Sequence, residues 1–317
     1  MKEDTTKSKK ILFTALLNSM VVVLEMLYGM ISNSLALITD ALHNLSDVLA
    51  LIIALVAIYY ATKAAHAKMT FGYVRAEMMA AFINSLFLTL TMLIVLYEAC
   101  MRFLNPLEVE VYSVMVVASV ALFVNGLSAY LLKDYHHLHH HHHAHAHADD
   151  HTHHHCSHSH EDLNLKAAYL HMLGDAAISL GVILGAIATL YLQTPYIDPL
   201  LTFAFGLYIL KSSFGVLKES FLSLMDANPE DIQKYKELLL SFEEIASVHD
   251  IHLTHPSSKE KFFSAHIVFS TDQSLAEIEQ TIEKIRQKLH EIYSVTHSLL
   301  QPESMKYAVE EEYCTAH

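Results

Sequence analysis

Charged residues are scarce in this sequence of 317 residues. They make up 17% of the chain, whereas an ordinary soluble domain carries about 25%. Residues 11–62 contain no lysine or arginine, and 53% of the whole chain is hydrophobic, with a mean hydropathy of +0.30. This composition excludes a plain globular enzyme, and it excludes disorder over most of the chain. It predicts a bundle of helices that span a lipid bilayer.

Further shortages in the sequence reduce the set of possible functions. Only three cysteines are present, which gives no even framework for structural disulfides. The 20 basic residues are outnumbered by 34 acidic ones, and a net charge of −14 would repel phosphate, so a nucleic-acid partner is excluded. No GxxxxGK[ST] segment occurs, so we do not expect ATP to drive the protein. Histidine, by contrast, is abundant at 25 residues, which makes metal binding the first chemistry to test.

Six apolar segments are long enough to cross the bilayer. A helix that rises 1.5 Å per residue needs roughly 20 residues to cross a ~30 Å hydrocarbon core. The qualifying segments are residues 11–31, 35–61, 77–103, 111–132, 165–192 and 200–223. Lysine and arginine gather in the loops on one side, which places those loops and both termini in the cytoplasm. The predicted parts are therefore a cytoplasmic N-terminus (1–10), a transmembrane domain (11–225) and a cytoplasmic C-terminal domain (226–317).

The C-terminal domain has the pattern of a small α+β unit. Pro229 and the two acidic residues after it open a helix that we expect to run to about residue 244. Strands over 246–253 and 262–269, a helix over 274–293 and a last strand over 297–301 complete an αββαβ order. A domain of about 90 residues has a small core, so it has much to gain from dimerisation.

Ionisable side chains inside the predicted spans carry the functional signal, because such groups cost several kcal/mol in a bilayer. In the second span, Asp40, His43 and Asp47 lie within about 60° of one helix face. In the fifth span, His171 and Asp175 are one turn apart, at the same spacing as His43 and Asp47. Face to face, the two pairs would form a cage of two nitrogen and two oxygen ligands. Such a cage suits the tetrahedral preference of Zn²⁺.

Other interpretations of these polar residues are weaker. They could be polar contacts between helices, as we expect for Asn18, Asn84 and Asn125, but two identical pairs in mid-span favour a metal. A membrane dimetal enzyme of the desaturase type would carry histidine boxes near the cytoplasmic helix ends, whereas here histidines alternate with aspartates within spans. We therefore predict that the protein is not an enzyme. Glu25 in the first span is open between a hydrogen-bonded packing residue and a proton relay.

A histidine-rich loop separates the fourth and fifth spans. Residues 136–160 contain 15 histidines among Ala, Asp, Thr and Ser, with no apolar face. Such a tract binds metal weakly and in many geometries, because ordering it costs entropy. We interpret it as a cytosolic zinc collector or sensor that is not essential for translocation.

Longer stretches surround the two pairs. They are residues 34–37 (SLAL), 40–47 (DALHNLSD), 70–75 (TFGYVR), 163–175 (LNLKAAYLHMLGD), 198–199 (DP) and 248–252 (VHDIH). In this combination the sequence resembles the cation diffusion facilitators, in their zinc-transporter branch. The resemblance runs from about residue 11 to residue 303, which is nearly the whole chain.

The resemblance implies a homodimer of six-helix subunits, each with a metallochaperone-like cytoplasmic domain, that exports Zn²⁺ in exchange for protons. The transport ligands that it implies are His43, Asp47, His171 and Asp175, with Asp40 as a gating or supporting carboxylate beside them. The cytoplasmic metal ligands that it implies are His249, His266, His297 and Glu303. Zinc transporters of this kind usually end in two cysteines, whereas this chain has only Cys314. Whether the cytoplasmic cluster holds one ion or two therefore stays open.

The predicted function is secondary active transport by alternating access. Zn²⁺ needs neutral imidazoles and ionised carboxylates, so protons compete with it for the same side chains near physiological pH. The competing hypothesis is a membrane-anchored zinc sensor or buffer: the histidine-rich loop supports it, and the paired sites in the spans argue against it. The choice among Zn²⁺, Cd²⁺ and Co²⁺ stays open, because their affinity orders overlap. The compact chain favours a bacterial plasma membrane over a eukaryotic organelle.

Overall fold

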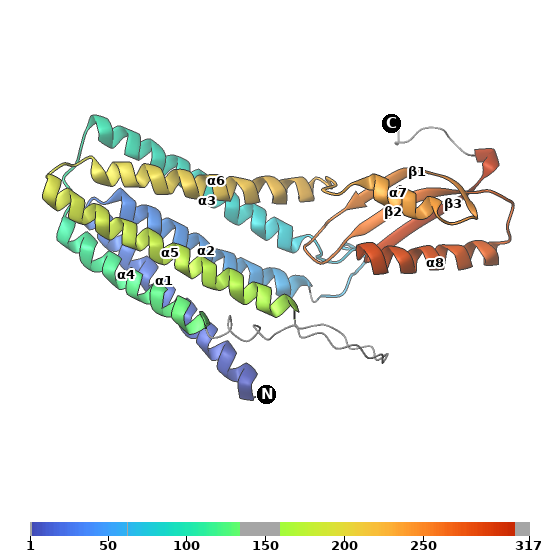
Figure 1. Cartoon of the computed structure of the whole chain (residues 1–317), viewed down its shortest axis with the longest axis horizontal. Coiled ribbons are helices and arrows are strands. Elements are labelled where there is room, and N and C mark those ends of the chain that lie inside the picture. Colours follow the sequence, from blue (N-terminus) through green and yellow to red (C-terminus); the bar gives the residue numbers. More distant parts are fainter. Residues whose placement is uncertain (1, 62, 134–158, 308–317) are drawn as a thin grey trace, which may run out of the picture. The chain divides into compact units, whose positions relative to one another are not determined.

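The computed structural model describes residues 2–61, 63–133 and 159–307 (Figure 1). Six long helices come first, followed by a small α/β domain, in agreement with the predicted fold class. The bounds of the long helices are α1 Lys2–Ile31, α2 Leu35–Ala61, α3 Ala76–Leu104, α4 Val111–Lys133, α5 Ser159–Leu192 and α6 Ile197–Leu224. Each contains the whole of one predicted span. The helices α1 and α5 extend furthest beyond the prediction, because polar residues continue the helix at their N-terminal ends.

The apolar character of these helices fits a bilayer. Within the part of the chain that the structure describes, four helical stretches are long and apolar enough to cross a membrane: Ala76–Leu104, Val111–Tyr130, His171–Leu192 and Ile197–Leu224. A shorter apolar stretch, Leu16–Ile31, lies in α1. Large apolar side chains such as Ile94 and Phe123 are about two-thirds exposed, as expected for side chains that face lipid tails.

The chain divides into two compact units. The first, here the helical unit, comprises residues 1–51 and 86–214, and the second, here the C-terminal unit, comprises residues 52–85 and 215–317. The division passes through α2, α3 and α6, so one end of each of these helices belongs to the C-terminal unit together with the loop between α2 and α3.

Small residues bring helices close together in the helical unit. A Cβ atom added at Gly185 on α5 would meet Leu201 Cδ1 at 1.9 Å, and one at Gly181 would meet Phe205 Cζ at 2.7 Å. These two glycines therefore let α5 approach α6, as small residues do in membrane bundles. On α4 and α5, the buried Ala118, Val182 and Ala186 join one apolar cluster with Leu37 of α2.

Asp198, at the start of α6, caps the start of α2. Its Oδ1 accepts a hydrogen bond from Ser34 Oγ at 2.5 Å, and its Oδ2 accepts one from the backbone N–H of Leu35 at 2.8 Å. The backbone N–H of Ala36 lies 3.4 Å from Oδ1. The first N–H groups of a helix have no partner within the helix, so this carboxylate satisfies them and fixes where α2 begins.

The turn between α1 and α2, residues 32–34, is also held from two other elements. Arg102 near the end of α3 donates to the carbonyl oxygen of Asn33. The backbone N–H of Glu110, just before α4, donates to the carbonyl oxygen of Ser32 at 2.9 Å. This three-residue turn is therefore bonded to the α3 end, the α4 start and the α6 start.

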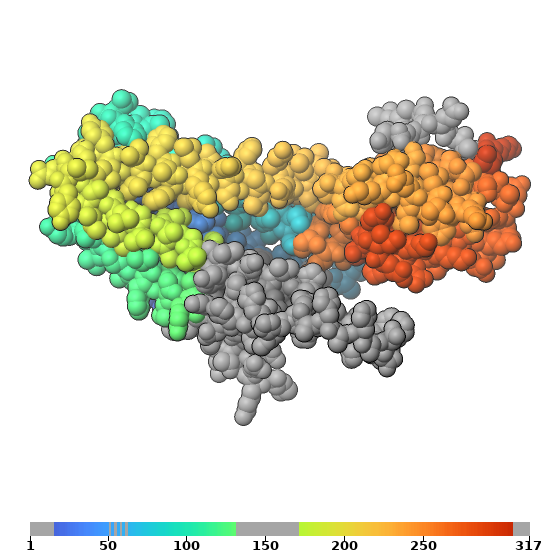
Figure 2. All heavy atoms as spheres, viewed as in Figure 1, coloured from blue at the N-terminus to red at the C-terminus, as the bar shows by residue number. Residues whose placement is uncertain are grey.

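The C-terminal unit contains the predicted αββαβ domain (Figure 1). Its elements are α7 Ile232–Leu240, β1 Ile245–Thr254, β2 Phe262–Phe269, α8 Leu275–Tyr293 and β3 His297–Ser304, followed by a 3-10 turn at Met305–Tyr307. The sheet has the order β1-β2-β3, with β1 antiparallel and β3 parallel to β2. Apolar side chains of α7, α8 and the sheet form one buried core, and the domain fills space as a continuous body (Figure 2).

One helix of this domain is shorter than the sequence predicts. Asp231 accepts the backbone N–H of Gln233 and caps α7, so the helix begins at Ile232 rather than at Pro229. It ends at Leu240 instead of about residue 244, because Ser241 and the turn after it lead directly into β1.

Candidate metal transport site

The two predicted pairs face each other across α2 and α5. His43 Nε2 lies 3.5 Å from Asp175 Oδ1, and His171 Nε2 lies 3.1 Å from Asp47 Oδ2. Within each helix, the i, i+4 separations are 3.9 Å for His43–Asp47 and 3.7 Å for His171–Asp175. Each imidazole therefore faces one carboxylate of its own helix and one of the opposite helix.

These separations match those of a tetrahedral zinc site. Ligand atoms at 2.0–2.2 Å from a tetrahedral Zn²⁺ lie about 3.3–3.6 Å from one another, and the four N···O distances above range from 3.1 to 3.9 Å. Ligand atoms of His43, Asp47 and His171 all lie within 4.8 Å of one another. Asp175 contacts each imidazole through a different oxygen, so its side chain would have to move closer to Asp47 for the four side chains to surround one ion.

Access to the site differs between its two ends. The side chains of His171 and Asp47 are 38% and 34% exposed, whereas those of His43 and Asp175 are 18% and 3% exposed. Asp47 is nearer the C-terminal end of α2, and His171 is nearer the N-terminal start of α5. The two more exposed ligands are therefore the ones nearer the C-terminal end of α2 and the N-terminal end of α5.

Asp40 lies outside this cage, in a separate buried network. Its Oδ2 accepts a hydrogen bond from Ser179 Oγ at 3.1 Å, and its Oδ1 lies 3.5 Å from Asn44 Nδ2. The same amide nitrogen is 3.2 Å from Glu25 Oε2 on α1. Glu25 and Asp40 are 0% exposed. The sequence singled out both acids, but it did not predict that Asn44 and Ser179 connect them.

A second cluster of metal-ligating groups lies on the sheet of the C-terminal unit. His249 of β1 and His266 of β2 are register partners, with ring centroids 5.2 Å apart. Glu303 of β3 lies beside both: its Oε1 is 2.9 Å from His266 Nδ1, and its Oε2 is 3.4 Å from His249 Nε2. One ligand thus comes from each strand, and the three fit a divalent metal such as Zn²⁺.

A β-bulge adds Asp250 to this cluster. The register between β1 and β2 shifts between His249 and His252, and Asp250 has the left-handed backbone angle φ = 50°. Its Oδ2 lies 3.5 Å from His266 Nε2, and its Oδ1 lies 3.0 Å from His252 Nε2. Carboxylates in this position orient metal-ligating histidines.

One predicted metal ligand lies away from these sites, and two further predicted metal-binding features fall outside the described residues. His297 pairs with Phe262 at the start of β3, and its ring lies 5.2 Å from the Phe262 ring, six residues before Glu303. Cys314 and most of the predicted histidine loop, residues 136–158, lie outside the residues that the structure describes.

The chain matches two protein-family models in sequence. Residues 11–225 match the cation efflux transmembrane domain, and residues 227–305 match the cytoplasmic domain of cation efflux proteins. The chain belongs to the cation efflux family. This result confirms the resemblance found in the sequence, and it makes the protein a multi-pass integral membrane protein of a transporter family.

Curated relatives cover nearly the whole chain. A cadmium, cobalt and zinc/H(+)-K(+) antiporter of Bacillus subtilis is 31% identical over 303 residues, 95% of this chain and 90% of that protein. The zinc transporter ZitB of Pectobacterium atrosepticum is 30% identical over 318 residues, 99% of this chain and 90% of its own length. The metal cation efflux protein CzcD of Cupriavidus metallidurans is 30% identical over 279 residues, 87% of this chain and 80% of its own.

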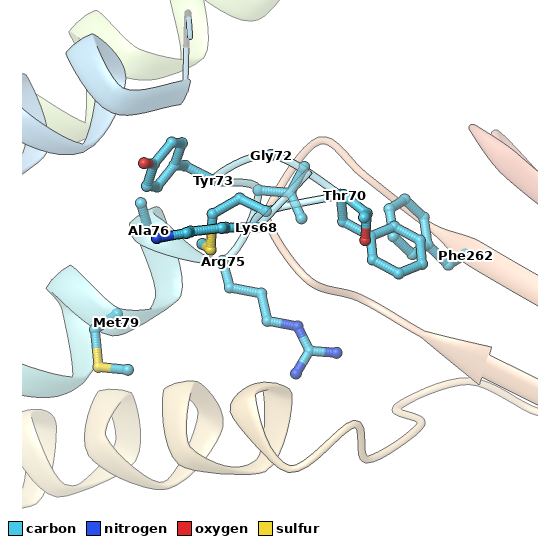
Figure 3. Close-up of a pocket in the computed structure, with 11 residues that line it drawn as sticks. Lys68, Thr70, Gly72, Tyr73, Arg75, Ala76, Met79 and Phe262 are labelled. Carbon is cyan, nitrogen blue, oxygen red and sulfur yellow. The ribbon is translucent and has the colours of Figure 1, made fainter. Parts of the chain in front are cut away.

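The loop between α2 and α3 borders a pocket of about 490 Å³ in the C-terminal unit (Figure 3). Phe262 of β2 and Met79 of α3 complete its lining, and Arg75 extends from it to an ion pair with Asp226 after α6. None of its lining residues is His, Cys, Asp or Glu. This pocket therefore offers no side-chain ligands of the kinds that the metal sites use.

Proposed function

We propose that this protein exports Zn²⁺ from the cytoplasm in exchange for protons, with His43, Asp47, His171 and Asp175 as the transport site. The observation that carries the proposal is the face-to-face arrangement of the two His–Asp pairs, at spacings that suit tetrahedral zinc. The names of the relatives support it, since they include zinc transporters and a zinc/H(+)-K(+) antiporter.

Protons and zinc would compete for the same atoms of this cage. Zn²⁺ binds neutral imidazole nitrogen and ionised carboxylate oxygen. Each imidazole Nε2 already faces a carboxylate oxygen, so a proton on that nitrogen has an acceptor when the metal leaves. Protonation on the outer side would then favour release of Zn²⁺, and the return of protons to the cytoplasm would complete the exchange.

The uneven access to the cage supports an inward-open state. We propose that both termini lie in the cytoplasm, as the distribution of basic residues predicts. The ends of α2 and α5 beside residues 61 and 159 then face the cytoplasm, and His171 and Asp47 are exposed on that side. In alternating access, a rearrangement would close this side and open the side of Asp175.

The cytoplasmic parts would regulate the carrier. We propose a homodimer, which fits the small core of the C-terminal domain, in a bacterial plasma membrane. A Zn²⁺ ion held by His249, His266 and Glu303 would link the three strands. If the ion binds the dimer more tightly than the monomer, it stabilises the dimer by that difference in affinity. Residues 136–160 would collect zinc for the transport site. Cys314 or His297 would add a further ligand to this ion, from a rearranged chain or from a partner subunit.

Flux into proteoliposomes tests the transport function. Inside-out vesicles that contain the full chain and an imposed pH gradient should accumulate Zn²⁺, and a panel with Cd²⁺ and Co²⁺ would measure selectivity. Asp47→Ala should abolish the flux in protein that still folds, whereas the exposed control Asp272→Ala should transport normally. Zinc binding without gradient-dependent uptake by the wild type would instead support the sensor or buffer hypothesis.

A further inference from the structure

Two carboxyl groups are buried together on α1 and α2. Glu25 of α1 and Asp40 of α2 are both 0% exposed, and their side chains are hydrogen-bond neighbours. Residues 11–62 and 167–192, which cover most of α1, α2 and α5, contain no lysine or arginine. Two ionised carboxylates at this place would repel each other in a medium of low dielectric.

The hydrogen bonds around the pair leave room for one more. Asn44 and Ser179 donate to Glu25 Oε2 and to both oxygens of Asp40. The remaining oxygen, Glu25 Oε1, is buried and has no hydrogen-bond partner among the residues that the structure describes. A proton on one carboxyl would supply a donor between the two groups. Adjacent carboxyls that share one proton are a known solution to this arrangement.

We propose that Glu25 and Asp40 together hold one exchangeable proton at a site separate from the metal cage, and that this proton is a counter-ion of transport. The inference rests on the proposed exchange of Zn²⁺ for protons. The titratable groups of the cage that act on the pair through their charge are Asp175 and His43. The histidine favours an ionised pair, whereas the aspartate favours a protonated one.

The name of the Bacillus subtilis relative also mentions K⁺. A proton fits the site better than K⁺ does. Asn44 and Ser179 turn an N–H and an O–H group toward the carboxylates. Selective K⁺ sites instead surround the ion with oxygen atoms in place of its hydration shell.

The network is attached to both helices that carry the transport ligands. Asp40 and Asn44 flank His43 on α2, and Ser179 lies one turn after Asp175 on α5 and contacts its backbone carbonyl oxygen at 3.1 Å. A Zn²⁺ ion in the cage would place two positive charges near the pair and weaken its hold on the proton. By linkage, the proton would weaken zinc binding by the same factor. Zinc entry from the cytoplasm would then release this proton to the cytoplasm, and protonation from outside would help to expel the zinc.

Proton counting on the full chain tests this proposal. Zinc titration calorimetry in buffers of different ionisation enthalpy measures the protons released per Zn²⁺. We expect Glu25→Gln to bind zinc within a few-fold of wild type but to release about one proton fewer, while the exposed control Glu108→Gln matches wild type. In vesicles, Glu25→Gln should still exchange Zn²⁺ for Zn²⁺ across the membrane. Its zinc uptake driven by a pH gradient should fall at least about tenfold, since one coupled proton is missing.

Infrared difference spectroscopy adds a measurement on the wild type, whose result does not depend on whether a variant folds. Zinc binding to wild type should reduce the carbonyl absorption of a protonated carboxylic acid, and Asp40→Asn or Glu25→Gln should remove that change. The proposal would be overturned if the variants released as many protons per Zn²⁺ as wild type and showed the same infrared change. It would also be overturned if zinc transport by wild type were lost when K⁺ is replaced by choline at constant pH. If wild type transports no zinc at all, the proposed function fails, while the wild-type infrared result still decides whether the pair holds a zinc-sensitive proton.

Discussion

Asp198 offers a direct way to test how the start of α2 is held. Asp198→Ala removes the acceptor of two short hydrogen bonds, from Ser34 and Leu35, and of a longer one from Ala36. A buried donor that loses a charged acceptor costs roughly 1–3 kcal/mol, and loss of a helix cap typically costs about 1 kcal/mol. Because the third bond is long, we expect about 3–5 kcal/mol of destabilisation in total.

Asp198→Asn separates the hydrogen bonds from the mere volume of the side chain. With its oxygen in the place of Oδ1, asparagine keeps the acceptor for Ser34 and Ala36, but its NH₂ group faces the N–H of Leu35. We expect about 1–2 kcal/mol for this variant. Thermal unfolding of the purified full chain in detergent should therefore rank wild type above the asparagine variant and the asparagine variant above the alanine variant. Equal melting of the alanine and asparagine variants would refute the capping role, and Asp272→Ala serves as the exposed control.

The remaining predictions concern selectivity, capture and pH. His43→Asp should widen transport from Zn²⁺ toward Cd²⁺ or Mn²⁺, because an oxygen replaces an imidazole nitrogen; an unchanged ratio in a flux panel would contradict this ligand role. Deletion of residues 136–160 should leave the maximal flux nearly intact and raise the zinc concentration for half-maximal flux, and loss of all flux in correctly inserted protein would make the loop part of the carrier. In the C-terminal domain, burial by itself would raise the pKa of Glu230, but the hydrogen bonds from Lys261 and Tyr235 and the charge of Lys261 outweigh it and lower that pKa below its ordinary value of 4.5. The stabilisation by this pair is therefore present above pH 4.5 and is lost as the pH falls through the lowered pKa. Glu230→Gln should thus speed hydrogen exchange over residues 227–305 at neutral pH and have little effect on it in strong acid. Equal exchange rates of variant and wild type at neutral pH would contradict this prediction.

Features that depend on local spacing were predictable from the sequence. The i, i+4 separation alone puts His43 over Asp47 and His171 over Asp175, so each half of the cage follows from helix geometry. The apolar runs gave the helix positions for the same reason, and β2 agrees with its predicted range to the residue.

Features that depend on contacts distant in sequence were not predictable in this way. Nothing near Ser34 indicates that its partner is Asp198, 164 residues away. His297 and Glu303 lie on the same strand, but only the register of β3 with β2 decides that Glu303 reaches His266. The sequence also gives no sign of the β-bulge, at which Asp250 adopts a left-handed backbone angle. This bulge turns Asp250 toward the same histidine.

The short turn at residues 32–34 gives α2 a pivot with a long lever arm. Since α3, α4 and α6 are bonded to this turn near their own ends, a tilt of α2 leaves its first residues in place. Asp47 lies about 18 Å along the helix from Leu35, so a tilt of about 5° moves it by roughly 1.6 Å. That displacement is most of the length of a zinc–oxygen bond of about 2.0–2.2 Å. A rotation too small to disturb the packing around the turn can therefore take an ion's ligands apart.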